Sequence, residues 1–238
     1  MRVLKFHEIG KKTGAIDVRV SYRIIQLFSD GLYSSPNKAI EELVANAWDA
    51  GAEHAHVILP SDRDAPDAQI VVIDDGTGMN EAGLRQHWLL GDSKKREDSS
   101  PPKGRKPIGK FGIGKLATYV LAQRLTHITR VNGKFFSTSM DYRLIDKSQG
   151  AATTEKVVKL PLRELTQAQA QSAVEEWTRG SSPAQKALKL FGKGAANSWT
   201  VAVMSDLRPM AKDLSPGRLR WVLAVSYTHL TLPTNREV

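Results

Sequence analysis

The segment from residue 35 to residue 51 constrains the fold more than any other part of the chain. Ser35 and Pro36 suit a helix cap followed by the first helical position, and Gly51 suits a helix end. Apolar residues recur between these limits at helical spacing: Ile40, Leu43, Val44 and Ala47. The sequence therefore predicts a helix over residues 35–50 that packs one side against a sheet.

The rest of the chain alternates short β-rich runs with helical patterns. Asn132-Gly133, a strong turn dipeptide, predicts a hairpin over residues 124–145. Further strands are predicted over 54–60, 68–76, 156–160 and 198–207, and helices over 79–91, 114–122, 165–180, 182–192 and from about 214. Hairpin connections among mixed elements predict an α+β two-layer sandwich, with a mixed, largely antiparallel sheet and helices on one face. Four tryptophans are expected to be packing residues: Trp48, Trp88, Trp177 and Trp221.

Composition favours one folded domain in a reducing compartment. The 238 residues are 41% hydrophobic, which is enough for a core, and the absence of cysteine excludes disulfides, Cys-ligated metals and a Cys nucleophile. No apolar run is long enough to span a bilayer, and the N-terminal segment lacks a signal-peptide pattern. We therefore expect a cytoplasmic protein without a membrane partner.

Positive charge is concentrated in one part of the chain. The formal net charge is +9, and residues 91–115 carry eight Lys or Arg against three acids. The polar stretch from Asp92 to Lys110 is too long for a tight turn and is predicted to be a mobile flap. Charge alone leaves three interpretations open: a solvated loop, a polyphosphate site or a nucleic-acid surface.

Three polar residues share a second face of the first helix, at spacings i, i+4 and i+7: Glu42, Asn46 and Asp49. The plain interpretation is a solvent-facing stripe. The alternative is a functional face, because magnesium prefers oxygen ligands and binds few protein groups together with phosphates and waters. Asn46 would then supply a magnesium ligand, and Glu42 would deprotonate a water that attacks a terminal phosphate.

The second motif is IVVIDDGTGMN, in which a strand runs into two acids and two glycines. Gly76 and Gly78 let the backbone turn sharply and approach a flat ligand. The carboxylate of Asp74 can accept a hydrogen bond from a donor such as the exocyclic amine of adenine. The alternative is an ordinary Asp-Gly turn.

The third motif, GRKPIGKFGIGKLATY, combines glycines and lysines ahead of a predicted helix: Gly109, Lys110, Gly112, Gly114 and Lys115. Such backbone exposes N–H groups to an anion and suits phosphates, although a flexible linker has the same composition. Two common phosphate fingerprints fail. Leu116 stands where the Walker loop needs Ser or Thr, and the glycines follow no strand, as the dinucleotide fingerprint requires.

The order of the three motifs is more specific than any one of them. E-x-x-x-N-x-x-D-A on a helix is followed by D-x-G-x-G after a strand and by G-x-x-G-x-G before a helix. This order resembles the Bergerat-fold, or GHKL, ATPases, which include gyrase-type topoisomerases, 90-kDa heat-shock chaperones, histidine kinases, MutL and MORC proteins. The resemblance covers roughly residues 30–208.

The resemblance implies a role for each matching position. The general base, the magnesium ligand and a residue lining the pocket would be, in that order, Glu42, Asn46 and Asp49. The adenine amine would bind Asp74, and the base would lie near Gly76, Gly78, Met79 and Thr200. The match at Thr200 is weaker, because Ser198 and Trp199 precede it where a glycine often stands. The phosphates would be cradled by Gly109, Lys110, Phe111, Gly112, Gly114 and Lys115.

The resemblance implies Mg²⁺-dependent binding and slow or partner-dependent hydrolysis of ATP by the N-terminal part of a longer protein. The intact Glu42 argues against the histidine kinases, which lack that glutamate. We expect a domain over residues 1–225 with an ATP lid at about 92–114. Residues 226–238 break from the preceding helical pattern and resemble a vector-derived tail; a frayed native end is the alternative.

Two further hypotheses remain. One is a nucleotide-gated module, in which ATP drives homodimerisation or partner capture with little turnover. The other places nucleic acid on the basic surface, which requires binding that weakens steeply with salt.

Overall fold

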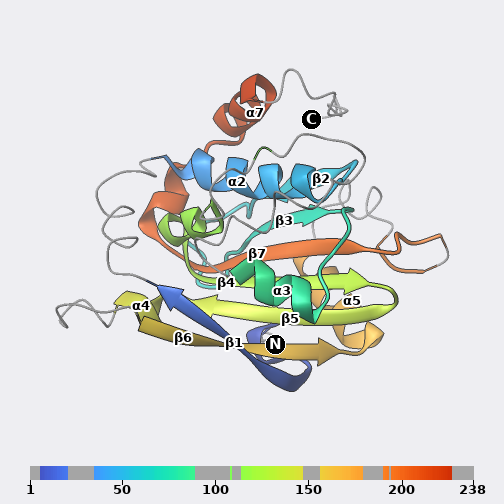
Figure 1. The fold of residues 1–238 in the computed structure, drawn as a ribbon. Coiled ribbons are helices and arrows are strands. Elements are labelled where there is room, and N and C mark those ends of the chain that lie inside the picture. The colour runs from blue at the N-terminus through green and yellow to red at the C-terminus, as the bar shows by residue number, and fades with distance from the viewer. Residues whose placement is uncertain are drawn as a thin grey trace.

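One seven-stranded sheet, in the order β1-β6-β5-β4-β7-β3-β2, forms the centre of the structure (Figure 1). The computed structural model describes residues 6–20, 35–88, 108, 114–146, 156–178, 190–192 and 194–226. The strands are β1 Lys11–Val20, β2 Ala55–Ile58, β3 Ile70–Asp74, β4 Ala122–Val131, β5 Lys134–Asp141, β6 Lys156–Leu165 and β7 Trp199–Leu207. Neighbouring strands in this order are antiparallel.

Helices cover the two faces of the sheet unequally. The α-helices are α2 Pro36–Asp49, α3 Glu81–Trp88, α4 Arg143–Asp146, α5 Gln167–Thr178 and α7 Pro216–Ser226. The 3-10 helices are η1 Phe6–Glu8, η4 Gly114–Val120 and η5 Pro209–Asp213. The larger core lies between one face and α2, α3, η4 and η5, and α7 packs on the outside of α2 (Figure 1). A smaller core joins α5 to the opposite face. The predicted α+β fold is confirmed, and α5 adds a cover that the prediction lacked.

The first helix forms where the sequence predicts it. Its apolar stripe is buried, with Ile40 fully inaccessible and Leu43 and Val44 nearly so. Gly51 follows the helix with a φ of 72°, a left-handed conformation that glycine adopts without strain. The helix therefore ends where Gly51, which has no Cβ, lets the chain turn toward β2.

The hairpin of β4 and β5 is also confirmed. Asn132 and Gly133 have φ values of 49° and 75°, as a two-residue turn with both central residues in the left-handed region requires. The strands pair from Arg124 opposite Asp141 to Val131 opposite Lys134.

The structure differs from the prediction in β1 and in the segment 114–122, and also in α4, which replaces the end of the predicted hairpin, and in β6, which runs five residues further than predicted. β1 was not predicted, although Ile16 and Val18 are buried on either side of the exposed Asp17 and show the alternation of a strand. The segment predicted as a helix over 114–122 is a 3-10 helix, closed by a hydrogen bond from Leu121 N to the Thr118 carbonyl at 3.0 Å. Because β4 begins at Ala122, the helix has to end within this short span.

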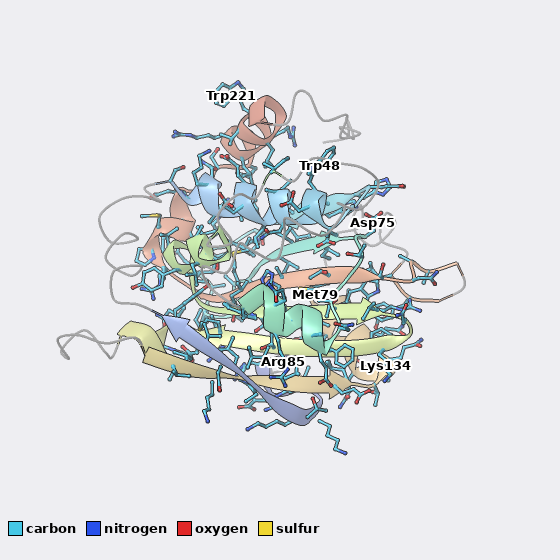
Figure 2. The ribbon with its side chains drawn as sticks, viewed as in Figure 1. Trp48, Asp75, Met79, Arg85, Lys134 and Trp221 are labelled. Atoms are coloured by element: carbon cyan, nitrogen blue, oxygen red, sulfur yellow. The ribbon has the colours of Figure 1, made fainter. Side chains whose placement is uncertain are left out.

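Some predictions concern residues that the structure does not describe, and one prediction about a tryptophan is wrong. The lid at 92–114 lies outside the described residues except for Ile108 and Gly114, as does the helix at 182–192 except for its last three residues, and the tail after Ser226. Trp88 is fully buried, as expected, but Trp221 is 65% exposed on the outer side of α7, so that prediction is wrong (Figure 2). None of the helices in the described ranges combines the length and apolar character needed to cross a bilayer.

Candidate functional site

The polar face of α2 carries the three residues predicted from spacing. Glu42, Asn46 and Asp49 are each half-buried, whereas the helix positions between them are mostly in the core. A helix whose apolar side is fixed on a sheet holds such side chains on rigid backbone. The three side chains therefore share one partly exposed face of a helix whose opposite face lies in the core.

The carboxyl group of Glu42 lies in a setting that favours its protonated form. Burial raises its pKa above the ordinary value, Lys38 opposes this, and the charges of Glu41 and Asp49 add to it. Lys38 instead bonds to the Glu41 carboxylate at 2.6 Å. A raised pKa improves a carboxylate as a proton acceptor near neutral pH.

Asp49 connects α2 to the third motif. Its Oδ1 accepts a hydrogen bond from the backbone N–H of Ile108 at 2.8 Å, and the Ile108 side chain packs against the larger core. The carboxylate of Asp49 therefore holds the residue that directly precedes Gly109.

Asp74 ends β3 and is 9% exposed. Its Oδ1 accepts a hydrogen bond from Gly76 N at 3.0 Å. Burial raises the pKa of Asp74 to about 7, the Gly76 bond acts in the opposite direction, and the charge of Asp75 raises it further. A carboxylate with so little solvation gains strongly from an additional hydrogen-bond donor.

The neighbouring Asp75 has a structural role. Its oxygens accept hydrogen bonds from the backbone N–H groups of Glu53 and His54, at 2.7 and 2.8 Å, and lie 2.8 Å from His54 Nδ1. Burial alone would raise its pKa, but these bonds lower it below the ordinary value. Asp75, at the end of β3 in Figure 2, fixes the connection between α2 and β2.

Gly76 and Gly78 lie where a side chain would collide with neighbouring atoms. A Cβ on Gly76 would come within 2.8 Å of the Ala50 Cβ and 2.9 Å of its carbonyl oxygen. Gly78 has a φ of 64°, and a Cβ there would collide with the carbonyl oxygen of Arg130. The absence of side chains at the two glycines thus lets the turn after β3 pack closely against the end of α2 on one side and β4 on the other.

Asp74 and Thr200 face each other across neighbouring strands. They are register partners on β3 and β7, and Thr200 is in turn the partner of Thr129 on β4. Directly opposed residues of antiparallel strands point to the same face, and here the alternation of buried residues makes it the face that carries α2. Thr129 also accepts a hydrogen bond from Met79 N at 2.7 Å, yet nothing in the sequence singles it out.

The third motif is described at Ile108 and from Gly114 onward. Gly114 begins η4, which packs along α2, and only the backbone of Lys115 is described. Gly109, Lys110, Phe111 and Gly112 lie outside the described residues. The described parts of the second and third motifs therefore adjoin α2, which carries the first. The turn after β3 bonds to Ala50 at the end of the helix, Ile108 bonds to Asp49, and η4 packs along the helix.

The described part of the chain contains no group of three or more His, Cys, Asp or Glu side chains able to hold a metal ion. A magnesium ion needs no such group, because one amide or carboxylate oxygen suffices when phosphates and waters complete its shell. The half-buried amide of Asn46 fits that donor set.

Residues 33–174 match the family described as histidine kinase-, DNA gyrase B- and HSP90-like ATPase. The chain is 35% identical over 107 residues to a putative type II restriction enzyme HgiDII of Herpetosiphon aurantiacus, covering 44% of this chain and 16% of that protein. It is 25% identical over 166 residues to the chaperone protein HtpG of Bacillus licheniformis (59% and 26%) and 27% identical over 142 residues to that of Rickettsia prowazekii (47% and 21%). The chain thus spans about a quarter or less of the length of these relatives.

Proposed function

Because the chain belongs to the histidine kinase-, DNA gyrase B- and HSP90-like ATPase family, we propose that residues 1–225 form a Mg²⁺-dependent domain that binds and hydrolyses ATP. The observation that carries this proposal is the buried Asp74 carboxylate, which lies opposite Thr200 and beside a glycine turn pressed against α2. A buried acceptor in this position suits the amine of adenine.

In this proposal the turn after β3 binds the base. Asp74 accepts the adenine amine, while Gly78, Met79 and Thr200 lie around the ring. The absence of side chains at Gly76 and Gly78 brings the turn backbone close to α2 and β4. Such packing fixes the turn before a ligand arrives, which reduces the entropy cost of binding.

The phosphates belong, in this proposal, between α2 and the third motif. Backbone N–H groups around Gly112 and Gly114, with the charges of Lys110 and Lys115, would hold them. Asn46 would hold Mg²⁺, which neutralises phosphate charge when bound. The family resemblance and the packing of η4 along α2 support this placement.

Glu42 is the proposed general base for hydrolysis. It lies one helical turn before Asn46, so a water between the two side chains could be deprotonated close to the terminal phosphate. The partial burial that raises its pKa also supports this role.

Replacing Asn46 with alanine tests the magnesium assignment. Mg²⁺ should tighten ATP binding by the wild-type chain. In the variant this increase in affinity should be about tenfold smaller, because a ligand oxygen is missing. Isothermal titration with and without Mg²⁺ measures both affinities. Asn37→Ala, at the other end of α2, is the matched control and should keep the Mg²⁺ effect. Unchanged magnesium dependence in Asn46→Ala would refute the assignment.

A nucleic-acid function is the second candidate. One relative is named a putative type II restriction enzyme, a DNA-cutting class, and the chain carries a net charge of +9. If DNA binds here, its affinity should fall at least about tenfold between 50 and 200 mM salt and should persist without ATP, because counterion release drives such binding. Fluorescence anisotropy of a labelled duplex measures this. Salt-independent or undetectable binding would exclude this candidate.

A further inference from the structure

The hydroxyl of Thr129 lies where β4, β7 and the turn after β3 meet. The residue is fully buried. Its Oγ1 accepts a hydrogen bond from Met79 N at 2.7 Å and donates one to the carbonyl oxygen of Trp199 at 3.0 Å. One side-chain atom therefore links two segments that are about 120 residues apart in sequence.

The first link fixes the direction of the turn. Gly78 has no side chain to anchor it, and its left-handed backbone lies directly against the carbonyl of Arg130. The bond from Met79 N to Thr129 then sets the course of the chain as it leaves Gly78. Figure 2 shows Met79 beside the start of α3. The direction of the chain after Gly78 therefore sets the direction of the Met79 side chain.

The second link fixes the beginning of β7. The indole Nε1 of Trp199 bonds to the Leu190 carbonyl at 3.1 Å, and its ring packs in the smaller core. The Trp199 carbonyl is held from the other side by Thr129. Thr200, the next residue, is thereby aligned between Asp74 and Thr129.

We propose that Thr129 is a positioning residue for the adenine-binding end of the site. It does not touch the nucleotide; it sets the separation between the Gly78–Met79 turn and the pair of Asp74 and Thr200. This inference rests on the proposed function, because it assumes that the base lies between these groups.

Thr129→Val removes the hydroxyl and keeps the shape of the side chain. It leaves Met79 N–H and the Trp199 carbonyl without this partner, so Kd and KM for ATP should rise about tenfold. The kcat at saturating ATP should stay within about twofold, because the residue acts on binding. Calorimetry with the 238-residue chain gives Kd, steady-state turnover gives KM and kcat, and thermal melting verifies folding.

Two variants make the test specific. Thr129→Ser keeps both hydrogen bonds and should bind ATP like the wild type. Thr126→Val removes a buried hydroxyl from the same strand, but that hydroxyl bonds to Ser139 at 2.9 Å and not to the turn, so affinity should hold.

The outcomes separate this inference from the proposed function. A wild-type chain that fails to bind ATP overturns both. Wild-type binding with an unaffected Thr129→Val, or equal weakening by Thr126→Val, overturns the positioning role alone. If Thr129→Val does not fold, Thr129→Ser decides: tight binding supports the role, and weak binding overturns it.

Discussion

Replacing Asp74 with asparagine is expected to weaken ATP binding by about a hundredfold, because a buried charged acceptor is lost and an amide donor can face the adenine amine. Titration of the variant with ATP measures the change. Asparagine has nearly the same shape as aspartate, and Gly76 N can still donate its hydrogen bond to the side-chain oxygen, so the turn should stay in place. An affinity within about threefold of the wild type would show that Asp74 does not bind the base.

The same substitution should stabilise the empty protein at alkaline pH. The folded pKa of Asp74, about 7, exceeds the ordinary 3.8, so its contribution to stability is full below pH 3.8 and is lost as the pH rises through 7. Asparagine has no such loss and should raise the unfolding free energy at pH 8 by roughly 1 to 3 kcal/mol. Denaturant unfolding at several pH values measures this.

Asp75→Asn is the matched control for the effect on stability. The pKa of Asp75 is lowered, so its carboxylate stabilises the fold above its ordinary pKa and loses that effect as the pH falls through the lower folded value. Its replacement should therefore destabilise the protein at neutral pH, opposite in sign to Asp74→Asn. If the two variants shift stability in the same direction, the account of burial given for Asp74 is wrong.

Glu42→Gln is expected to lower kcat by about 10²- to 10⁴-fold with little change in ATP affinity, because a positioned base contributes to the reaction and not to ground-state binding. Single-turnover hydrolysis and calorimetry give the two quantities. Glu41→Gln is the control: it removes a neighbouring charge, but that carboxylate pairs with Lys38.

The Glu42 variant also separates the enzyme from a nucleotide-gated module. If ATP binding drives dimerisation and hydrolysis only times it, Glu42→Gln should dimerise with ATP at the wild-type affinity and dissociate more slowly. Analytical ultracentrifugation with and without ATP records this. Equal losses of turnover in Glu41→Gln and Glu42→Gln would remove Glu42 as the base.

Elements with local signals were predictable from the sequence. Pro36 and Gly51 bound α2, and the Asn132-Gly133 turn sets the hairpin, because each is specified by residues within a few positions. The motif residues on α2 and after β3 were predictable for the same reason. Their order along the chain also led to the family.

Features that depend on distant partners were not predictable. Thr129 acquires its place from Met79 and Trp199, which no local pattern around residue 129 reveals. The different roles of Asp74 and Asp75 likewise depend on the fold, because only the folded chain brings His54 and Glu53 to the Asp75 carboxylate.

The interior position of β7 affects how the chain reaches its native state during synthesis. β7 is inserted between β4 and β3, so residues emerging earlier form two strand groups without a shared edge until residue 207 has left the ribosome. Such late, long-range pairing slows folding and leaves open edges that favour aggregation. A translation product stopping near residue 174, where the family match ends, would lack the strand that joins them.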